Sequence, residues 1–292
     1  MFVIIGILAV FGAVLGGFLM EKGPLLVLVQ PSEFIIIAGA ALGTLLSANP
    51  MFVLKRIVGS LIHVLKGPKN SKKHYIDLLK MMYSLFTKAR REGLPSIESD
   101  IEEPAKSQLF AKYPAFLKGG HVCEFVCDTM RMAIIGGASP FDLDQMMELD
   151  MEVHHAGEVQ SATALSTMAD ALPGLGIVAA VLGVVVTMSS LGGPPEEIGH
   201  KVAAALVGTF LGILLCYGVV GPLGSNLNKL VDDDSAIFHV LRVVMLAFIK
   251  GMSPALAIEM GRRAIPEHVR PTFHEVDKAC RQKDEPVAAQ AA

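Results

Sequence analysis

The sequence predicts an all-α membrane protein with four transmembrane helices, a large helical cytoplasmic domain between helices 2 and 3, and a cytoplasmic C-terminal tail. Of the 292 residues, 52% are hydrophobic, which is too apolar for an ordinary soluble domain. At 18% charged residues, the chain is also too polar to consist of membrane helices alone. Four segments stay uncharged for about the 20 residues that a spanning helix needs. We find no segment with the alternating pattern of a β-strand.

The first two predicted spans lie at the N-terminus. Residues Phe2–Met20 are uncharged and follow Met1 without the basic region and cleavage site of a secretory signal, so we expect a retained first helix. The second uncharged run covers Phe34–Leu54, with Pro50 close to its end. Residues 1–54 are therefore predicted to form transmembrane helices 1 and 2.

The third and fourth predicted spans form a hairpin around which the chain is organised. Residues 171–195 and 202–228 carry no charge. Both runs are rich in glycine and alanine, and in the fourth span small residues recur every four positions at Ala204, Gly208 and Gly212. Small residues let helix backbones approach each other closely in a membrane. Residues 169–228 are therefore predicted to pack tightly against other helices.

Pro173 and Pro222 lie near opposite ends of this hairpin, and hence on the same side of the membrane. A proline inside a helix removes one backbone hydrogen bond and allows bending. Two interpretations stay open at this point. The prolines are flexing points of a moving helix pair, or they mark helix ends and kinks without a moving role.

The distribution of charge predicts the orientation of the spans. Six basic residues follow the second span before the first acidic residue: Lys55, Arg56, Lys66, Lys69, Lys72 and Lys73. The link between the third and fourth spans has two glutamates and one lysine instead. Because basic flanks stay in the cytoplasm, we expect both termini to be cytoplasmic. Residues 55–168 then form a cytoplasmic domain, and residues 229–292 form the cytoplasmic tail.

The periodicity of the 55–168 segment predicts helices. Apolar residues keep a 3.6-residue spacing from Ile76 to Phe86 and again from Val122 to Ala133. The predicted breaks and starts are Gly93 with Pro95, Gly136 with Gly137, and Ser139 with Pro140, the last pair opening a helix that runs through Asp150. The segment from residue 55 to 160 has fourteen basic and fourteen acidic residues. A protein partner suits such a mixed surface better than an anionic lipid surface.

The tail is predicted to contain a helix and a disordered end. An apolar run that ends at Lys250 is too short for a span and has Arg242 at its centre, so we expect a cytoplasmic helix packed on the loop domain. Residues 282–292 are expected to be disordered. The four cysteines fall in cytoplasmic or membrane segments and are expected to be free thiols: Cys123, Cys127, Cys216 and Cys280.

Neither a cofactor, a catalytic site nor a nucleic-acid interface is predicted. The net charge is −3, and no block rich in lysine and arginine stands out. Two groups have the spacing of metal ligands: His121 with Cys123 and Cys127, and His154 and His155 with Glu158. The same spacing fits one face of a helix, and zinc sites usually show a second ligand pair. We therefore expect no metal.

Ion movement through the membrane would require an ionisable group within a span, and the sequence of this chain shows none there. Glu33 and Asp170 sit only at predicted span borders, so no carboxylate is expected deep in a span. A protein that moves protons or sodium normally needs an ionisable group within the membrane, and a partner would have to provide it. Thr209, midway along the fourth span, either lines a pathway or bonds to its own backbone.

Arg90 and Glu98 lie on either side of the Gly93–Pro95 break, so they belong to different helices joined by a turn. On local sequence alone they are an ordinary solvated pair worth less than about 1 kcal/mol. A larger role depends on a resemblance to known proteins.

Three motifs carry such a resemblance: ALPGLGIVAAVLGVV in the third span, VGTFLGILLCYGVVGPL in the fourth, and PALAIEMGRRAIPEHVRPTF in the tail. Together with REGLPSIESDIEEP in the loop, they make nearly the whole chain resemble the MotA/PomA family of flagellar motor stator proteins, part of the MotA/TolQ/ExbB superfamily. Four spans with one large loop between the second and third fit this family as well.

The resemblance implies an inner-membrane ring of five such subunits around two copies of a MotB-like partner, whose single transmembrane aspartate carries the ion. Pro173 and Pro222 resemble the family's conformational prolines, and Thr209 resembles the threonine that faces that aspartate. Ala180 stands where sodium-driven relatives carry a threonine that helps to bind the ion. A methyl group offers sodium no oxygen ligand, which favours protons.

The resemblance also implies the output of the complex, in which ion flux drives torque on the rotor without covalent chemistry, so we expect no enzyme. Arg90 and Glu98 resemble the charged residues that engage the rotor protein FliG. Asp150 stands where related chains often have glutamate, and its role stays open. The alternative is an ExbB-like or TolQ-like energiser of outer-membrane processes, a class with three spans. A solute transporter would need inverted repeats or a polar site, and neither is found in this sequence.

Overall fold

The computed structural model describes residues 2–68, 70–189 and 192–281, and these form helices joined by short turns, with no strand among them. The chain divides into two compact units. We call Met1–Gly67 with Gly157–Val231 the span unit, and Pro68–Ala156 with Asp232–Ala292 the loop-and-tail unit. The predicted all-α fold is confirmed for the described residues.

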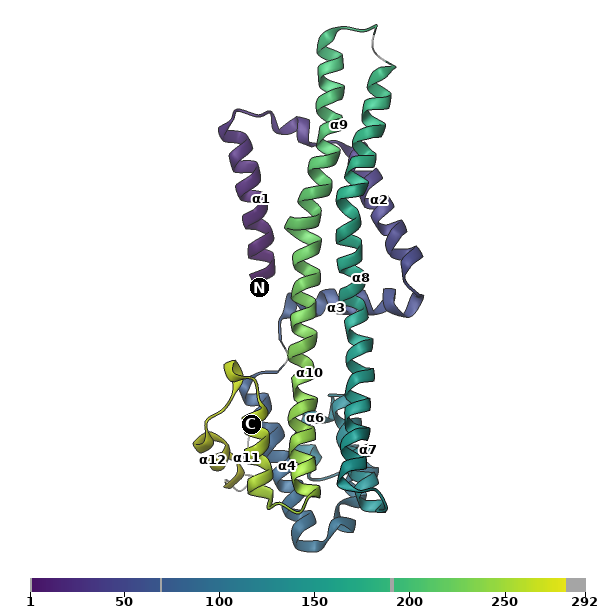
Figure 1. The fold of residues 1–292 in the computed structure, drawn as a ribbon. Helices are drawn as coiled ribbons and strands as arrows, with labels where there is room; N and C mark the ends of the chain where they lie inside the picture. Colours follow the sequence, from purple (N-terminus) through teal and green to yellow (C-terminus); the bar gives the residue numbers. More distant parts are fainter. Residues whose placement is uncertain (1, 69, 190–191, 282–292) are drawn as a thin grey trace. The chain divides into compact units, whose positions relative to one another are not determined.

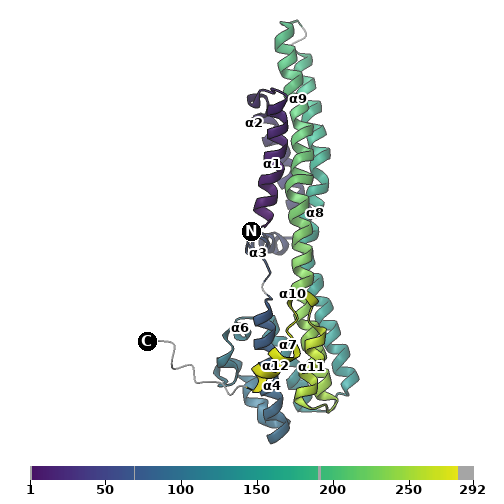
Figure 2. The same ribbon diagram turned by 90° about the vertical axis from the view of Figure 1, so that its left-hand side faces the viewer.

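In the part of the chain that the structure describes, four helices are long and apolar enough to cross a membrane, as the sequence predicts. The elements that contribute to the span unit are α1 (Phe2–Met20), η1 (Leu25–Leu28), α2 (Pro31–Ala48), α3 (Met51–Lys66), part of α8 (Pro140–Met188), α9 (Pro195–Leu215), a π-helical turn (Cys216–Val220) and part of α10 (Gly221–Ile249). Figures 1 and 2 both show α8 and α9 running side by side through this unit.

The second span ends earlier than the sequence predicts. Helix α2 stops at Ala48, and a separate amphipathic helix, α3, begins at Met51. Pro50 separates them because its ring disfavours a helical conformation at the preceding residue, and Asn49 is indeed extended, with φ −130° and ψ 138°. Helix α3 buries Val53, Ile57 and Val64 against α8 and α10, which the absence of charge before Lys55 did not reveal.

Helices α8 and α10 are longer than predicted. The helix expected to run through Asp150 continues without interruption to Met188, and the tail helix continues from the end of the fourth span. No glycine or proline stands between Asp150 and Ala169 except Gly157, so nothing in that stretch stops the helix. Uncharged length and charge placed a boundary between each span and its neighbouring cytoplasmic segment. In the structure, the helical backbone continues across both of these boundaries.

The loop-and-tail unit is built around α4. Besides the start of α8 and the end of α10, its other elements are η2 (Leu94–Ile97), α5 (Glu98–Glu102), η3 (Pro104–Lys106), η4 (Phe110–Lys112), α6 (Pro114–Leu117), α7 (His121–Ile135), α11 (Pro254–Ala264), η6 (Glu267–Val269) and α12 (Phe273–Arg281). Helix α4 spans Lys72–Glu92 and buries large side chains, including Tyr75, Leu79 and Phe86. The rings of Phe86 and Phe248 stack with centroids 4.0 Å apart, which joins α4 to α10.

The predicted helix breaks in this unit are confirmed. Helix α4 ends at Gly93, whose φ of +90° is a conformation that glycine adopts without strain. Helix α7 ends at Gly136, with φ +77°. At the start of α8, the Ser139 hydroxyl accepts a hydrogen bond from the Asp142 amide at 3.2 Å, while the Asp142 carboxylate accepts from the Ser139 amide at 2.9 Å. The predicted disorder of residues 282–292 concerns a segment outside the described residues.

The predicted packing of the tail helix on the loop domain is also confirmed. The 237–248 part of α10 buries an apolar face in the same core as α4 and α7. The Arg242 guanidinium donates from Nε to Asp144 Oδ1 at 2.6 Å and from Nη2 to Glu148 Oε2 at 3.3 Å. An arginine in the middle of an apolar run is therefore accommodated by two carboxylates on α8. Its hydrogen bond also holds the pKa of the Asp144 carboxyl below its ordinary value.

Candidate ion pathway and rotor-facing surface

The small residues predicted to bring the third and fourth spans together do so. A Cβ atom added to Gly212 would lie 2.6 Å from the Leu172 carbonyl oxygen and 2.8 Å from Gly176 Cα. A Cβ atom added to Gly176 would lie 2.8 Å from the Gly208 carbonyl oxygen. These distances are shorter than real Cβ contacts, so α8 and α9 touch backbone to backbone.

Ala180 and Thr209 lie at one level of this α8–α9 contact. A Cβ atom added to Gly208, the neighbour of Thr209, would lie 3.1 Å from the Ala180 amide nitrogen. Both Ala180 and Thr209 are half-buried. Within the described residues, the Thr209 hydroxyl has no hydrogen-bond partner, whereas the Thr187 hydroxyl donates to the Gly183 carbonyl at 2.8 Å. The Thr209 hydroxyl is therefore free to bond to a group outside this chain.

The two prolines are placed differently. Pro173 lies inside α8, half-buried, beside the tight contact made by Leu172 and Gly212. Pro222 is the second residue of α10 and follows the π-helical turn of Cys216–Val220 directly. In that turn the Gly221 amide donates to the Cys216 carbonyl, five residues back. The widened turn lets the helix continue through a residue that has no amide hydrogen to donate.

Glu33 departs from the expectation that no carboxylate lies deep in a span. The apolar segment that contains it begins upstream at Leu25, because η1 joins α2 in the candidate span Leu25–Ala48. The residue is only 5% exposed, and its Oε2 atom has no hydrogen-bond partner among the described residues. Its neighbours are the glycine positions of α8 and α9, which the sequence could not have matched with α2. Asp170, by contrast, is exposed.

Arg90 and Glu98 lie at the predicted turn in the loop-and-tail unit. Arg90 is in the last turn of α4 and Glu98 is the first residue of α5, and both side chains are exposed. Neither has an ion-pair partner among the described residues, so both charges face solvent without compensation.

A partly buried ion pair fixes the turn that carries them. Lys88 Nζ lies 2.7 Å from Asp100 Oδ2, and the Ser107 hydroxyl donates to Asp100 Oδ1 at 2.5 Å. Asp100 is one of the few buried charged residues, at 7% exposure. Sequence reasoning missed this pair, although the twelve-residue separation of Lys88 and Asp100 across a predicted break was a usable signal.

Asp150 lies on α8 with a histidine beside it. Its Oδ1 atom is 3.4 Å from His121 Nε2, and the His121 ring stacks on the His154 ring with centroids 4.1 Å apart. The Cys123 and Cys127 side chains are buried free thiols 4.0 Å apart. Among the described residues, no three His, Cys, Asp or Glu side chains are grouped closely enough to hold a metal ion.

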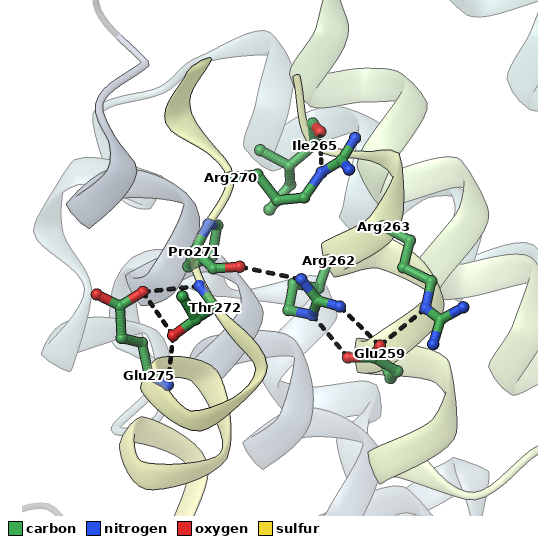
Figure 3. Close-up of polar contacts among 8 residues, drawn as sticks. All are labelled: Glu259, Arg262, Arg263, Ile265, Arg270, Pro271, Thr272 and Glu275. Carbon is green, nitrogen blue, oxygen red and sulfur yellow. Dashed lines mark hydrogen bonds and ion pairs between the residues drawn. The ribbon is translucent and has the colours of Figure 1, made fainter. Parts of the chain in front are cut away.

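The tail motif PALAIEMGRRAIPEHVRPTF forms a polar cluster between α11 and the start of α12 (Figure 3), and both helices contact α4. Glu259 accepts two hydrogen bonds from Arg262, at 2.7 and 2.8 Å, and one from Arg263 at 2.8 Å. Arg262 also donates to the Pro271 carbonyl at 3.0 Å, which ties α11 to the start of α12. The Arg262 hydrogen bonds lower the pKa of Glu259 to about 2.

Comparison with known proteins identifies the family. The family model "Motility protein A N-terminal" matches residues 4–93, and "MotA/TolQ/ExbB proton channel family" matches residues 120–239. Motility protein A of Escherichia coli K12 is 37% identical over 286 residues, 98% of this chain and 97% of the relative. Chemotaxis protein LafT of Vibrio parahaemolyticus is 35% identical, covering 94% of this chain and 96% of the relative.

Solved structures show the same fold. The structure described as C. jejuni MotAB has a TM-score of 0.74 at 20% identity and covers 91% of this chain and 95% of that chain. The flagellar MotAB stator complex from Bacillus subtilis has a TM-score of 0.69 at 24% identity, covering 88% and 92%. The architecture and the identity over nearly the whole length confirm the resemblance seen in the sequence motifs. The chain belongs to the motility protein A family, within the MotA/TolQ/ExbB proton channel family.

Proposed function

We propose that this chain is a stator subunit of a bacterial flagellar motor, which forms a proton channel with a single-span, MotB-like partner and converts proton flux into torque on the rotor. The observation that carries the proposal is the 37% identity to a motility protein A over nearly the full length of both chains. The two solved structures of this fold are described as MotAB complexes, which supports a MotB-like partner here.

The ion path is proposed to run between the α8–α9 contact and the partner helix. The partner's membrane aspartate takes up and releases the proton, and the Thr209 hydroxyl, which has no partner among the described residues, bonds to that carboxyl group. Ala180 presents only a methyl group at the same level, and a methyl group cannot replace a water ligand of sodium. This favours protons over sodium.

Protonation of the partner's aspartate removes a buried charge and so changes which packing of the helices is preferred. The backbone contact of α8 and α9 has no interlocking side chains at Gly176 and Gly212, which favours small sliding movements. Pro173 and Pro222 are proposed as the positions where the helices bend. Helices α8 and α10 each supply residues to both units, which provides a covalent path for the movement.

The loop-and-tail unit is proposed to be cytoplasmic and to contact the rotor protein FliG through Arg90 and Glu98. Their exposure and their lack of ion-pair partners among the described residues support this, since uncompensated charges steer an oppositely charged partner. We further propose five copies of the chain around two partner chains in the inner membrane, with both termini cytoplasmic. The complex dissipates an ion gradient without covalent chemistry and is not an enzyme.

An ExbB-like or TolQ-like energiser remains the alternative, because one family model covers all three kinds of protein. The four candidate spans favour the stator, since the energisers have three. The match of residues 4–93 to the N-terminal model of motility protein A points the same way.

Complementation tests the proposal. In a strain that lacks this chain, the wild-type chain is expected to restore swimming at low sodium. Thr209→Ala is expected to abolish swimming, and Thr209→Ser, which keeps the hydroxyl, to retain most of it, with equal amounts of protein in the membrane. If the wild-type chain does not restore swimming but restores uptake across the outer membrane, the energiser is correct.

Charge reversal tests the rotor contact separately. Arg90→Glu and Glu98→Lys are each expected to reduce torque at unchanged protein level, because both side chains are exposed and unpaired in the described structure. Glu103→Lys, which reverses an exposed charge whose ion-pair partner among the described residues is Lys106, is the matched control and is expected to swim normally. Normal swimming of both single variants and of the double variant would show that the proposed contact is wrong.

A further inference from the structure

The most unusual polar group of the span unit is the Glu33 carboxyl. It is 5% exposed, it lies within a candidate membrane span, and its Oε2 atom has no hydrogen-bond partner among the described residues. Ionisable side chains at such positions are costly and usually functional. The mechanism proposed above does not use it.

The carboxyl occupies a space that three small residues leave open. A Cβ atom added to Gly208 would lie 2.8 Å from Glu33 Oε2, and one added to Gly183 would lie 3.4 Å from Glu33 Oε1. The same added atom at Gly183 would lie 2.7 Å from Ala205 Cβ, so α8 and α9 are themselves in contact at this level. Glu33 of α2 therefore points into the α8–α9 contact and is not turned toward lipid.

This space lies next to the proposed ion path. Gly208 precedes Thr209 in α9, and a Cβ atom on Gly208 would lie 3.1 Å from the Ala180 amide nitrogen. The Glu33 carboxyl thus approaches, from the α2 side, the backbone that also carries Ala180 and Thr209.

An open hollow of about 570 Å³ is lined by residues that lie close in sequence to Glu33 and to Ala205. Its lining includes Gln30, one turn before Glu33, and Ala204, the neighbour of Ala205. Glu197 and His200 also line it, so the hollow is polar enough to hold water. Water in this hollow would bring protons to the start of α2.

We propose that Glu33 is a second proton-binding carboxyl of the pathway, supplied by this chain itself, which takes up a proton from water in the hollow and passes it, beside the α8–α9 contact, to the partner's aspartate of the proposed ion path. The inference rests on the proposed function. A neutral carboxyl fits the observed packing because it leaves no uncompensated charge, whereas an ionised carboxyl would need water or a donor. Loss of the proton therefore opens the contact of α2 with α8 and α9, and rebinding closes it.

A purely structural role makes a different prediction. If Glu33 only filled space as a neutral side chain, Glu33→Gln would replace it, since an amide has nearly the same shape and cannot exchange a proton. If Glu33 exchanges protons, Glu33→Gln blocks the exchange, and Glu33→Asp keeps it with a shorter side chain.

The experiment uses the full chain in the deletion strain, with Glu21→Gln as the matched control at an exposed glutamate outside the helices. At equal protein levels in the membrane, Glu33→Gln is expected to reduce swimming speed at least threefold. Glu33→Asp is expected to retain more than half of the wild-type speed, and Glu21→Gln all of it. Wild-type speed in Glu33→Gln would overturn the inference while leaving the stator assignment intact. Failure of the wild-type chain to restore swimming would instead sink the stator assignment.

A second measurement tests the proposal even if the Glu33→Gln chain does not accumulate in the membrane. Infrared spectra of the reconstituted wild-type complex are expected to show a carboxylic-acid C=O band that weakens as the pH is raised and that shifts in Glu33→Asp. A band at this position that does not change with pH would show a permanently neutral, structural carboxyl and would contradict the proposal.

Discussion

Each of the two units is stabilised internally by a different kind of helix contact. In the span unit, α8 and α9 touch through backbone atoms at Gly176, Gly208 and Gly212. In the loop-and-tail unit, the contact between α4 and α10 is made by large side chains such as Phe86 and Phe248. Lipid tails are as apolar as leucine side chains, so spans gain stability from close approach, whereas helices in water gain it from buried apolar area.

Polar side chains follow the same division. Within the candidate spans, the Thr44 and Thr187 hydroxyls donate to carbonyls of their own helices, each at 2.8 Å. Elsewhere in the span unit, Arg56 of α3 donates to the Gly157 carbonyl of α8 at 2.6 Å and so joins two helices. In the loop-and-tail unit, ion pairs join different helices, such as Arg242 with Asp144 and Lys72 with Glu275. The α8–α9 contact has no interlocking side chains at its glycine positions. In the loop-and-tail unit, ion pairs and large side chains fix how the helices lie along one another. This difference agrees with the proposed function, in which the membrane helices move and the loop-and-tail unit contacts the rotor.

The largest effect is expected where backbones touch. In Gly212→Ala, the added methyl group would meet the Leu172 carbonyl oxygen at 2.6 Å and Gly176 Cα at 2.8 Å. No side chain can rotate to relieve these contacts, so the helices must separate, and we expect a loss of more than about 3 kcal/mol. The amount of folded protein in the membrane and its thermal midpoint in detergent measure this. Gly174→Ala is the control, since its methyl group would have no atom within 4 Å. Equal losses in both variants would show that the backbone contact is not what holds α8 to α9.

A smaller loss of stability is expected at Gly261 of the loop-and-tail unit, and a second substitution should relieve part of it. A Cβ atom added to Gly261 of α11 would lie 2.0 Å from Val244 Cγ2. The obstacle is a side chain, so Gly261→Ala is expected to cost about 1–3 kcal/mol and Val244→Ala to relieve part of that cost. Hydrogen exchange of α11 amides in the single and double variants measures the coupling. Additive losses would mean that this contact behaves like the one in the membrane.

Much of this organisation could be predicted from local patterns. Uncharged length predicted the four spans, and the spacing of Gly208 and Gly212 predicted a close helix contact. Gly93 and Gly136 predicted helix ends because the chain there needs a positive φ, which glycine adopts at little cost. These features depend on residues near one another in the sequence.

The remaining features depend on which distant segments meet. Glu33 looked like a border residue because it directly precedes the uncharged run that begins at Phe34, and only the approach of Gly183 and Gly208 shows that it is buried. Helix α3 was missed because its first four residues, 51–54, continue the uncharged run of the second span, and Lys55 and Arg56 then indicated only where that span ends. The Glu259–Arg262 cluster was present in a motif but had no predicted partner for its arginine, which is the Pro271 carbonyl.

Removing one cross-helix ion pair is expected to have a moderate effect. The side chains of Arg242 and Asp144 are 20% and 23% exposed, so Arg242→Met leaves Asp144 partly buried without its donor. We expect a loss of about 1–2 kcal/mol. Arg131→Met is the comparison, because its pair with Glu102 is more exposed, at 35% and 49%, and should be worth under about 1 kcal/mol. Hydrogen exchange of α7 and α10 amides distinguishes the two variants. A larger loss in Arg131→Met would reverse the order that burial predicts.

The smallest effect is expected at Glu259, and it should depend on pH. Its folded-state pKa of about 2 lies below the ordinary value of 4.5 because Arg262, and then Arg263, donate to the carboxylate. A depressed folded-state pKa stabilises the fold above the unfolded-state value, and this contribution is lost as the pH falls from 4.5 toward 2. Glu259→Gln keeps the shape but not the charge, so it should weaken the protection of α11 at neutral pH by about 1 kcal/mol.

Hydrogen exchange of α11, corrected for the intrinsic effect of pH, measures this contribution. Wild-type protection should fall as the solution is acidified below pH 4.5, while Glu259→Gln should start lower and fall less. Glu267→Gln, at an exposed glutamate of η6, should follow the wild-type curve. If the Glu259→Gln and wild-type curves stay parallel down to low pH, the charge of Glu259 does not stabilise the tail. The packing of α11 on α4 would then depend on apolar contacts, and for this helix the contrast with the span unit would reduce to side-chain contacts against backbone contacts.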